Sequence, residues 1–454
     1  MTIANNQTSP KLSVVVPNHN GGVALKRCLD AIQSSSYPGF ECIVVDDDST
    51  DRWVETAKNS AFKVIELRDG PHGPAHARNV GAQAASGDIL FFLDADVVIY
   101  PDTLQKVADA FLRNNKLTAV FGSYDDQPGD GHFLSQYKNL FHRFVHQQAR
   151  EESRSFWSGC GAIRREVFLA MGGFDAVKYP QPSIEDIELG RRLSMRGHTI
   201  VIDKTIQVKH LKRWTLTNLI KTDIFSRGIP WTQLILADRA IPNDLNLETS
   251  QRWSALLSGA LLMTFAVSMF FFRQAILLPI LLCLFWFLLQ SWQWDEGTPR
   301  FELDRSAVLR IGVASLAFAG LAFWQGFAYL LPLLLVLLVI VIFASPLTKN
   351  VRSLRQATFA LMIAILAVML LQIIAAYPLW LIAVVCSIFG LFVFLNRKFY
   401  LFFIEMRGAA FAAAVIPFHM LYFLYSVASF VLGGMVYYRN NRLSLSSEQS
   451  RGDG

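Results

Sequence analysis

The second half of this sequence contains few charged residues. Residues 1–252 carry 58 Asp, Glu, Lys and Arg side chains, whereas residues 253–437 carry only 15. Soluble domains have about a quarter charged residues, so we expect the second stretch to be embedded in a membrane. A single soluble globule and a disordered chain are excluded. The net charge of +6 suits a protein on an anionic membrane surface and gives little support for nucleic-acid binding.

Paired cysteines, a secretion signal and two nucleotide-binding motifs are also missing. No CxxC pair occurs, so the cysteines are predicted to be small buried hydrophobes in a reducing compartment: Cys28, Cys42, Cys160, Cys283 and Cys386. The start, MTIANNQTSPKLSVVVP, has no apolar stretch behind basic residues, so we expect no cleavable signal and a cytosolic first half. GxGxxG after the first strand and GxxxxGK[ST] are both absent, which argues against a dinucleotide-binding dehydrogenase and a P-loop NTPase.

The first hundred residues alternate between strand and helix patterns. Strands are predicted at Ser13–Val16, Cys42–Val45, Lys63–Leu67 and Ile89–Leu93, with helices at Val23–Ser34, Val54–Asn59 and His76–Ala85. Apolar strands separated by crossover helices predict an α/β domain whose mostly parallel sheet is covered on both faces. Ligands of such sheets bind beyond the carboxyl ends of the strands. Those ends carry polar residues here: Asn18–Asn20, Asp46–Asp48 and Asp94–Asp96.

Three acidic motifs could carry chemistry. VVDDDSTD (Val44–Asp51) indicates either a ligand-binding cluster or a turn with capping residues, and alone it favours neither. Asp94 and Asp96 follow a buried strand and offer hard oxygen ligands to Mg²⁺ or Mn²⁺, with helix capping as the alternative. The pair Glu185-Asp186 at a predicted helix start could accept a proton, although such pairs are more often capping residues.

These motifs, in this order, resemble the family 2 glycosyltransferases of the GT-A fold. The resemblance covers roughly Lys11–Ile235 and rests on VVVPNHN, VVDDDSTD, GPAHARNVGAQAASGD, LDAD, GCGAIRR, GGFD, IEDIELGRR and a later His210. It implies a Rossmann-like GT-A catalytic domain that binds a UDP- or GDP-linked sugar. The implied nucleotide-sugar-binding residues are Pro17, Asn20, Asp46, Asp47, Arg78 and Asp94. The divalent metal would be held by Asp96, with Asp94 and His210, and Asp186 would be the catalytic base, with Glu185 beside it.

The implied chemistry is physically consistent. A metal neutralises the charge on a departing diphosphate, and a base deprotonates the attacking hydroxyl, which contributes roughly 10²–10⁴-fold. A single base opposite the leaving group predicts one in-line displacement, and therefore inversion at the anomeric carbon. The resemblance implies the same outcome.

The segment around His210 departs from one pattern of the family. Processive polysaccharide synthases carry QxxRW, whereas here His210 occupies the glutamine position, which argues against polymer synthesis. Arg213 and Trp214 remain, and with Arg227 they are candidates for binding the acceptor or a phosphate. Residues 133–148 form an amphipathic pattern, so packing or membrane-surface docking is favoured over a zinc site at His142 and His146.

The apolar half divides into a series of predicted membrane spans. The turns between successive spans alternate between very short ones and longer, basic ones. Because basic loops stay on the cytosolic side, this pattern predicts three hairpins that each start and end there. A seventh span, Ala409–Tyr437, leaves the side of the C-terminus open. The six spans of the hairpins are Ser254–Phe272, Gln274–Trp292, Ala307–Phe323, Gly326–Phe343, Ala357–Ala376 and Leu379–Leu395.

The predicted organisation is an N-terminal tail (1–10), a catalytic domain (11–212), interfacial helices (213–252), a transmembrane domain (253–437) and a polar tail (438–454). The favoured hypothesis is a multi-pass enzyme of the plasma (inner) membrane with its catalytic domain in the cytosol. It would transfer a sugar to a lipid-linked acceptor, with no nucleic-acid partner. The alternatives are a processive synthase with a membrane channel, and a membrane carrier or scaffold with an inactive nucleotide-binding head.

Overall fold

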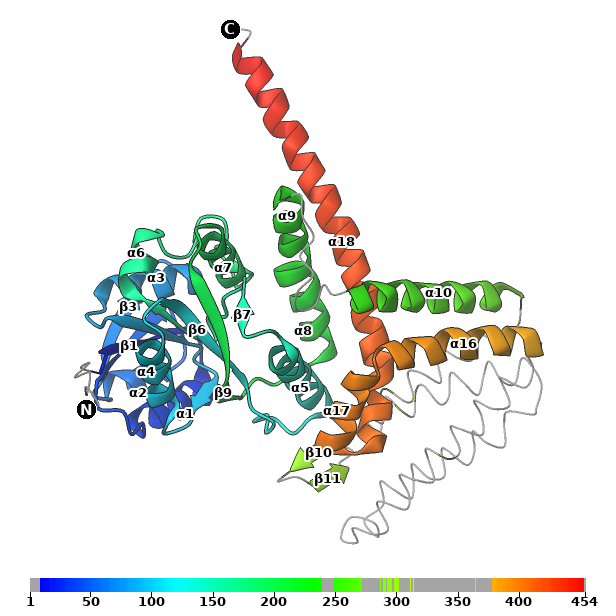
Figure 1. The fold of residues 1–454 in the computed structure, drawn as a ribbon, viewed down its shortest axis with the longest axis horizontal. Coiled ribbons are helices and arrows are strands. Elements are labelled where there is room, and N and C mark those ends of the chain that lie inside the picture. Colours follow the sequence, from blue (N-terminus) through cyan, green and yellow to red (C-terminus); the bar gives the residue numbers. More distant parts are fainter. Residues whose placement is uncertain are drawn as a thin grey trace, which may run out of the picture. The chain divides into compact units, whose positions relative to one another are not determined.

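The computed structural model describes residues 9–238, 249–271, 286, 289–290, 292–295, 298–301, 311, 313, 364 and 378–452. The chain divides into two compact units. One comprises Met1–Gly129, Lys138–Glu248 and Tyr425–Gly454, and the other Asp130–Tyr137 and Thr249–Leu424. Figure 1 shows the elements along the chain.

The first unit begins with a parallel sheet. Its strands run in the spatial order β3-β2-β1-β4, and every neighbouring pair is parallel. The α/β prediction with crossover helices is confirmed for this part. The strands are β1 (Leu12–Asn18), β2 (Phe40–Asp47), β3 (Lys63–Leu67) and β4 (Ile89–Leu93), and the helices between them are α1 (Gly22–Gln33), α2 (Val54–Lys58) and α3 (Pro74–Ala84).

The sheet continues with mixed strand directions. Strand β8 lies between β4 and β6 and is antiparallel to both, β9 is parallel to β6, and β5 and β7 are antiparallel to β9. These strands are β5 (Val97–Ile99), β6 (Leu117–Tyr124), β7 (Glu152–Ser153), β8 (Cys160–Arg164) and β9 (Thr199–His210). The helices of this part are α4 (Thr103–Arg113), α5 (Phe133–Gln148), α6 (Arg165–Ala170) and α7 (Glu185–Met195).

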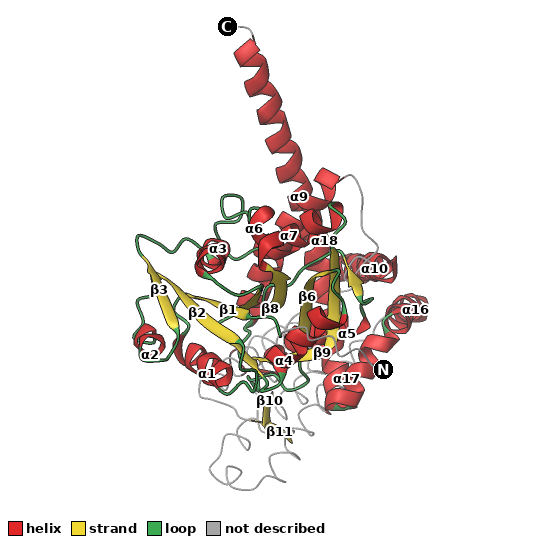
Figure 2. Cartoon of the chain, turned by 60° about the vertical axis from the view of Figure 1, so that its left-hand side comes forward, coloured by secondary structure: helices red, strands yellow, loops and turns green. Residues whose placement is uncertain are grey.

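Both faces of this sheet are covered. Figure 2 shows α1, α2 and α4 on one face and α3, α6 and α7 on the other. Successive strand residues alternate between the two apolar clusters: Val14 and Val16 pack on one face and Val15 on the other. Each such buried aliphatic side chain contributes about 1.5–3 kcal/mol. The free cysteines Cys28, Cys42 and Cys160 are buried as predicted, whereas Cys386 is exposed and Cys283 lies outside the described residues.

The first unit ends in a helical run over the residues predicted as interfacial. It consists of α8 (Leu216–Lys221), the π-helix η1 (Thr222–Gly228) and α9 (Ile229–Asp238). The last part of α18 (Ala409–Gly452) lies beside α9 in Figure 1. A Cβ on Gly228 would lie 2.5 Å from Ser429 Cβ, and one on Gly433 2.6 Å from Thr232 Cβ, so small residues let these helices approach closely.

The described residues of the second unit are helical, apart from one hairpin. Within the described part of the chain, Ala409–Asn440 is long and apolar enough to cross a membrane. Helices α16 and α17 pass the same test only together and are bent by 71° at their junction. The described elements are α10 (Thr249–Phe271), β10 (Trp292–Asp295), β11 (Thr298–Phe301), α16 (Leu379–Leu395), α17 (Arg397–Arg407) and the first part of α18.

Only some of the predicted membrane spans fall on residues that the structure describes. The spans at Ser254–Phe272 and Leu379–Leu395 correspond to α10 and α16, and the last span lies within α18. Helix α18 continues to Gly452, so the polar tail expected from residue 438 extends this helix. The multi-pass arrangement stays a prediction, because the remaining spans lie wholly or almost wholly outside the described residues: Gln274–Trp292, Ala307–Phe323, Gly326–Phe343 and Ala357–Ala376.

Candidate active site

The two acids at the end of β2 shape the loops that follow the strands. The buried carboxylate of Asp46 accepts hydrogen bonds from Asn18 Nδ2 at 2.8 Å and Ser49 Oγ at 2.6 Å. Asp47, also buried, accepts from the backbone N–H groups of Gly73 at 2.7 Å and His72 at 2.9 Å. Both carboxylates are therefore held by protein donors, and Asp47 ties the end of β2 to the start of α3.

Asn20 and Pro17 belong to the same corner. Asn20 has a positive φ of 51°, and its side-chain oxygen accepts from the N–H groups of Thr50 at 2.8 Å and Asp51 at 3.1 Å. Pro17 lies in β1 beside Val45 of β2. The fold thus brings Pro17, Asn20, Asp46 and Asp47 to neighbouring strand ends, and their contact with a nucleotide remains a prediction.

Arg78 joins two parts of the sequence that carry acidic motifs. From α3, its guanidinium donates to Asp94 at 2.7 Å and to Glu185 at 2.8 Å. Burial works against the charge, yet Asp94, Glu185 and Asp186 together raise the pKa of Arg78. Glu185 also accepts from the N–H of Ser183 at 3.0 Å. Both Glu185 oxygens are therefore engaged by protein donors.

Asp186 lies in the first turn of α7 with a different environment. Its Oδ2 accepts from the backbone N–H of Ser158 at 3.0 Å and from Ser158 Oγ at 3.1 Å. Burial, followed by repulsion from Glu185, raises the pKa of Asp186 from 3.8 to about 6. A carboxylate with a pKa close to neutrality can take a proton from a hydroxyl group in a transition state more readily than an ordinary aspartate.

Asp96 and His210 face each other across the pairing of β5 with β9. His210 Nε2 lies 3.4 Å from Asp96 Oδ2. On the other side of the ring, Nδ1 lies 2.5 Å from the side-chain oxygen of Asn139, which can only accept. Nδ1 therefore carries the hydrogen, and in a neutral ring Nε2 presents a lone pair to the carboxylate. Two lone pairs at this distance repel unless a proton or a cation lies between them.

The pair fits a divalent cation that keeps further positions for phosphate and water oxygens. A histidine that ligates a metal usually donates its other N–H to a fixed acceptor, which is what Asn139 provides. No cluster of three or more His, Cys, Asp or Glu ligands occurs among the described residues. Asp94, the third predicted ligand, is instead turned to Arg78.

An aromatic layer supports His210. The ring of Tyr124 stacks on His210 with centroids 4.4 Å apart and an angle of 7° between the planes. His142 and His146 pack against Trp157 at 5.6 and 5.1 Å. Burial lowers the pKa of both histidines, that of His146 to about 4, so they are neutral members of the core. This packing is one of the two alternatives, with membrane-surface docking, that were favoured over a zinc site for residues 133–148.

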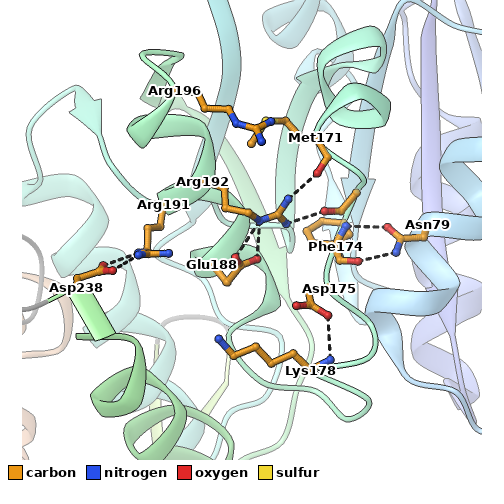
Figure 3. A network of polar contacts seen from close by, with 11 residues as sticks. Asn79, Met171, Phe174, Asp175, Lys178, Glu188, Arg191, Arg192, Arg196 and Asp238 are labelled. Atoms are coloured by element: carbon orange, nitrogen blue, oxygen red, sulfur yellow. Dashed lines mark hydrogen bonds and ion pairs between the residues drawn. The ribbon is translucent and has the colours of Figure 1, made fainter. Parts of the chain in front are cut away.

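The helix that carries Asp186 is fixed at its far side by a polar network (Figure 3). Arg192 donates to the carbonyls of Met171 and Gly173, both at 2.7 Å, and pairs with Glu188. Arg191 forms an ion pair with Asp238 of α9. Helix α7 is therefore held to both the 171–174 turn and the helical run.

The three candidates for acceptor or phosphate binding differ in exposure. Trp214 is buried, with the ammonium of Lys212 4.6 Å from its ring centroid, whereas Arg213 is exposed. Arg227, on η1, is 40% exposed and lies 3.6 Å from Asp223 Oδ1. Their role in binding stays a prediction.

Asn139, Tyr124 and Ser158 were not predicted from the sequence as site residues. Asn139, His142 and His146 lie three and four residues apart on α5, whose amphipathic pattern was predicted from the sequence. The spacing gave no sign that Asn139 would contact His210, 71 residues away.

Comparison with known proteins finds glycosyltransferases that are similar to the first part of the chain. Residues 13–172 match the sequence model of Glycosyl transferase family 2. An uncharacterized glycosyltransferase of Haemophilus influenzae is 35% identical over 119 residues, covering 25% of this chain and 47% of the relative. The UDP-Glc:alpha-D-GlcNAc-diphosphoundecaprenol beta-1,3-glucosyltransferase WfgD of Escherichia coli is 28% identical over 123 residues, covering 25% of this chain and 46% of that enzyme. The chain spans about half the length of these relatives.

A solved structure shows distant similarity. The mannosyltransferase PcManGT from Pyrobaculum calidifontis in complex with GDP-Man and Mn²⁺ is 19% identical, covers 80% of this chain and 88% of its own, and has a TM-score of 0.40. The similarity to Glycosyl transferase family 2 is thus confined to residues 13–172 of this chain.

Proposed function

We propose that this chain is a membrane-bound, metal-dependent inverting glycosyltransferase that transfers one sugar from a UDP- or GDP-linked donor to a lipid-linked acceptor. The observation that carries the proposal is the environment of Asp186. A carboxyl group whose pKa is raised to about 6 lies beside Glu185, which Arg78 holds as an ion pair. The adjacent acids therefore have separate roles, one as a proton acceptor and the other as an anchor.

The transfer step needs one base and one leaving group. The acceptor oxygen forms a bond to the anomeric carbon while its proton moves to a carboxylate oxygen of Asp186. The bond between that carbon and the diphosphate oxygen breaks, and the nucleoside diphosphate leaves with the electron pair. Attack opposite the leaving group inverts the anomeric configuration.

Asp96 and His210 would hold the divalent cation, Mg²⁺ or Mn²⁺. When bound, the cation would neutralise negative charge on the departing diphosphate. Asn139 holds the ring of His210 with Nε2 toward Asp96, and Tyr124 fixes the plane of that ring. Arg78 stays with Asp94 and Glu185, so its part is to keep the carboxylates of the site in place.

A lipid-linked acceptor is supported by two features. Residues 253–437 carry only 15 charged side chains, and Ala409–Asn440 is long and apolar enough to cross a bilayer. The printed name of the Escherichia coli relative describes a sugar transferred to a diphosphoundecaprenol-linked sugar. A membrane-bound enzyme is concentrated where such acceptors lie. The enzyme and the acceptor then meet by diffusion in two dimensions and not in three.

The proposal is tested with the purified full-length protein. It is incubated with UDP-glucose, UDP-N-acetylglucosamine, UDP-galactose or GDP-mannose, Mn²⁺ and lipid-linked sugar acceptors, and the products are analysed by mass spectrometry and NMR. We expect the addition of a single sugar with inverted configuration. Retained configuration, or a polymer as the product, would contradict this mechanism.

A further inference from the structure

A groove of about 280 Å³ lies along residues 178–183, the segment just before the proposed base in the sequence. One wall is the segment 178–183, which leads directly into Glu185 and Asp186, and the other is formed by η1 and α9. The two walls are joined by a hydrogen bond from Ser183 Oγ to the carbonyl of Ser226 at 2.8 Å. The groove lining includes Tyr179, Gln181, Ser183, Phe225, Pro230 and Gln233.

The wall made by η1 is anchored from behind. The buried carboxylate of Asp223 accepts from Lys138 Nζ and from the hydroxyl of Tyr425, both at 2.6 Å. Residues two apart on a helix point to nearly opposite sides, so anchoring Asp223 turns Phe225 outward. Phe225 is 61% exposed. Single π-helical turns are rare and frequently occur at functional sites.

The lining offers polar groups that suit a polyhydroxylated ring, and Lys178 adds one cationic donor that can bind sugar hydroxyl groups. Gln181 and Gln233 each offer a donor and an acceptor, and the Ser183 hydroxyl adds another polar group. The face of an aromatic ring is negative and attracts the C–H groups of an apolar sugar face. No carboxylate occurs among the described lining residues. The volume lies just below the range of about 300–1,000 Å³ that is typical of ligand sites, and it suits a single sugar ring.

We propose that this groove binds the acceptor sugar that carries the attacking hydroxyl, with Phe225 against the apolar face of the ring and Gln181 and Gln233 at its hydroxyl groups. The inference rests on the proposed function, because it assigns the acceptor subsite of that reaction. The position fits the chemistry, since a sugar here lies next to the segment that delivers Asp186.

Binding is tested without turnover, by saturation-transfer NMR on the full-length protein in detergent. The probes are the methyl glycosides of glucose, galactose, N-acetylglucosamine and mannose, with UDP and Mn²⁺ present. We expect at least one glycoside to bind, Phe225→Ala to weaken it about tenfold or more, and Phe225→Tyr to retain it. The matched control is Met195→Ala, which removes a different exposed apolar side chain, since Met195 is 72% exposed. This variant should bind the glycosides like the wild type.

The second measurement is the KM for the lipid-linked acceptor in the transfer assay. Phe225→Ala and Gln233→Ala should raise this KM about tenfold while UDP binding, measured by calorimetry, stays unchanged. If transfer occurs and neither variant alters glycoside binding or acceptor KM, the groove assignment is wrong although the proposed function stands. If no donor supports transfer, the proposed function fails, and glycoside binding sensitive to Phe225 still supports a sugar subsite.

A lipid surface is the other candidate for an exposed phenylalanine. Co-sedimentation with phosphatidylglycerol and phosphatidylethanolamine vesicles distinguishes it. If Phe225→Ala abolishes vesicle binding and leaves glycoside binding intact, the ring docks on lipid, and the acceptor-sugar assignment is overturned.

Discussion

The guanidinium of Arg78 donates a 2.8 Å hydrogen bond to the buried carboxylate of Glu185, which lies 107 residues away in the sequence. The same guanidinium reaches Asp94. A single buried cation thus connects the end of β4 to the start of α7. Glu185 is held in this ion pair, and the proposed mechanism assigns proton exchange to the adjacent Asp186.

Removing Arg78 should destabilise the first unit strongly. Arg78→Met leaves Glu185 and Asp94 without their cation, and breaking a buried pair typically costs about 3–5 kcal/mol. Urea unfolding of the full-length protein in detergent measures the loss. In Arg78→Met combined with Glu185→Leu, the loss should be smaller than the sum of the single losses. Arg68→Met is the control, because Arg68 is exposed and its partner Glu66 keeps Lys58 as a second cation, so little stability should be lost. Equal stability of Arg78→Met and wild type would refute the role of this pair.

The transfer rate should fall as the pH is lowered through about 6. Burial and Glu185 raise the pKa of Asp186 to about 6, and only the ionised form accepts a proton. The turnover rate at saturating donor and Mn²⁺ is measured from pH 5 to 8, and it should drop tenfold per pH unit below the pKa. A rate that is constant between pH 5 and 7 would exclude Asp186 as the base.

The same pKa shift predicts how stability changes with pH. The folded state holds a proton on Asp186 more tightly than the unfolded chain does, between about pH 4 and 6. Ionisation of this group therefore lowers stability as the pH rises through that window. The group is retained at a cost in stability, as expected for a residue that serves the reaction.

Asn139 should control metal affinity without touching the metal. It accepts from His210 Nδ1 and so directs Nε2 toward Asp96. Loss of such a partner commonly weakens metal binding about 10–100-fold. Mn²⁺ binding in the presence of UDP, followed by electron paramagnetic resonance, should weaken by this factor in Asn139→Ala. Asn139→Asp keeps an acceptor and should bind more tightly than Asn139→Ala, and the exposed Asn218→Ala should match the wild type. Unchanged Mn²⁺ binding in Asn139→Ala would show that the contact has no such role.

Substitution of Gly73 tests whether the loop that Asp47 holds is needed for nucleotide binding. Its φ is +92°, and a Cβ there would lie 2.3 Å from the carbonyl oxygen of Pro180. Gly73→Ala should therefore displace the loop, break the bond from Gly73 N–H to Asp47, and weaken UDP or GDP binding. Overpacking of this kind costs about 1–3 kcal/mol. Gly22→Ala is the control, because its φ is also positive, at +58°, but its Cβ would meet nothing within 4 Å.

In this comparison, calorimetry measures nucleotide affinity and thermal unfolding measures stability. We expect both to fall in Gly73→Ala, and Gly22→Ala to lose only some stability. If the two variants behave alike, backbone strain alone accounts for the effect and the contact with Pro180 does not matter.

Local patterns predicted several elements closely. Lys63–Leu67, Ile89–Leu93 and Leu379–Leu395 have the expected bounds, and residues 133–148 form the expected helix. The spacing of apolar residues and the turn residues beside them are local properties, so they can be recognised in a single sequence. The mixed half of the sheet was not predicted, because β8 enters between β4 and β6 through pairings between residues far apart in the chain.

The same contrast applies to the candidate site: local motifs could be recognised in the sequence, whereas contacts between distant residues could not. Motifs singled out Asp96, Asp186 and His210, and the structure brings Asp96 and His210 together. Arg78 was expected to bind the nucleotide sugar; in the structure it pairs with Asp94 and Glu185, and its contact with a nucleotide stays a prediction. Side-chain pairing across 71 or 107 residues depends on tertiary packing, so neither the Asn139–His210 contact nor the Arg78–Glu185 pair has a local signature.

The most direct test of the central claim is the pair of measurements on Asp186→Asn. The substitution removes the proton acceptor and keeps the size of the side chain. The account predicts that transfer falls by at least about 10²-fold, while calorimetry with UDP or GDP and Mn²⁺ gives nearly the wild-type affinity. A transfer rate close to wild type, at unchanged donor binding, would contradict the assignment of Asp186 as the base.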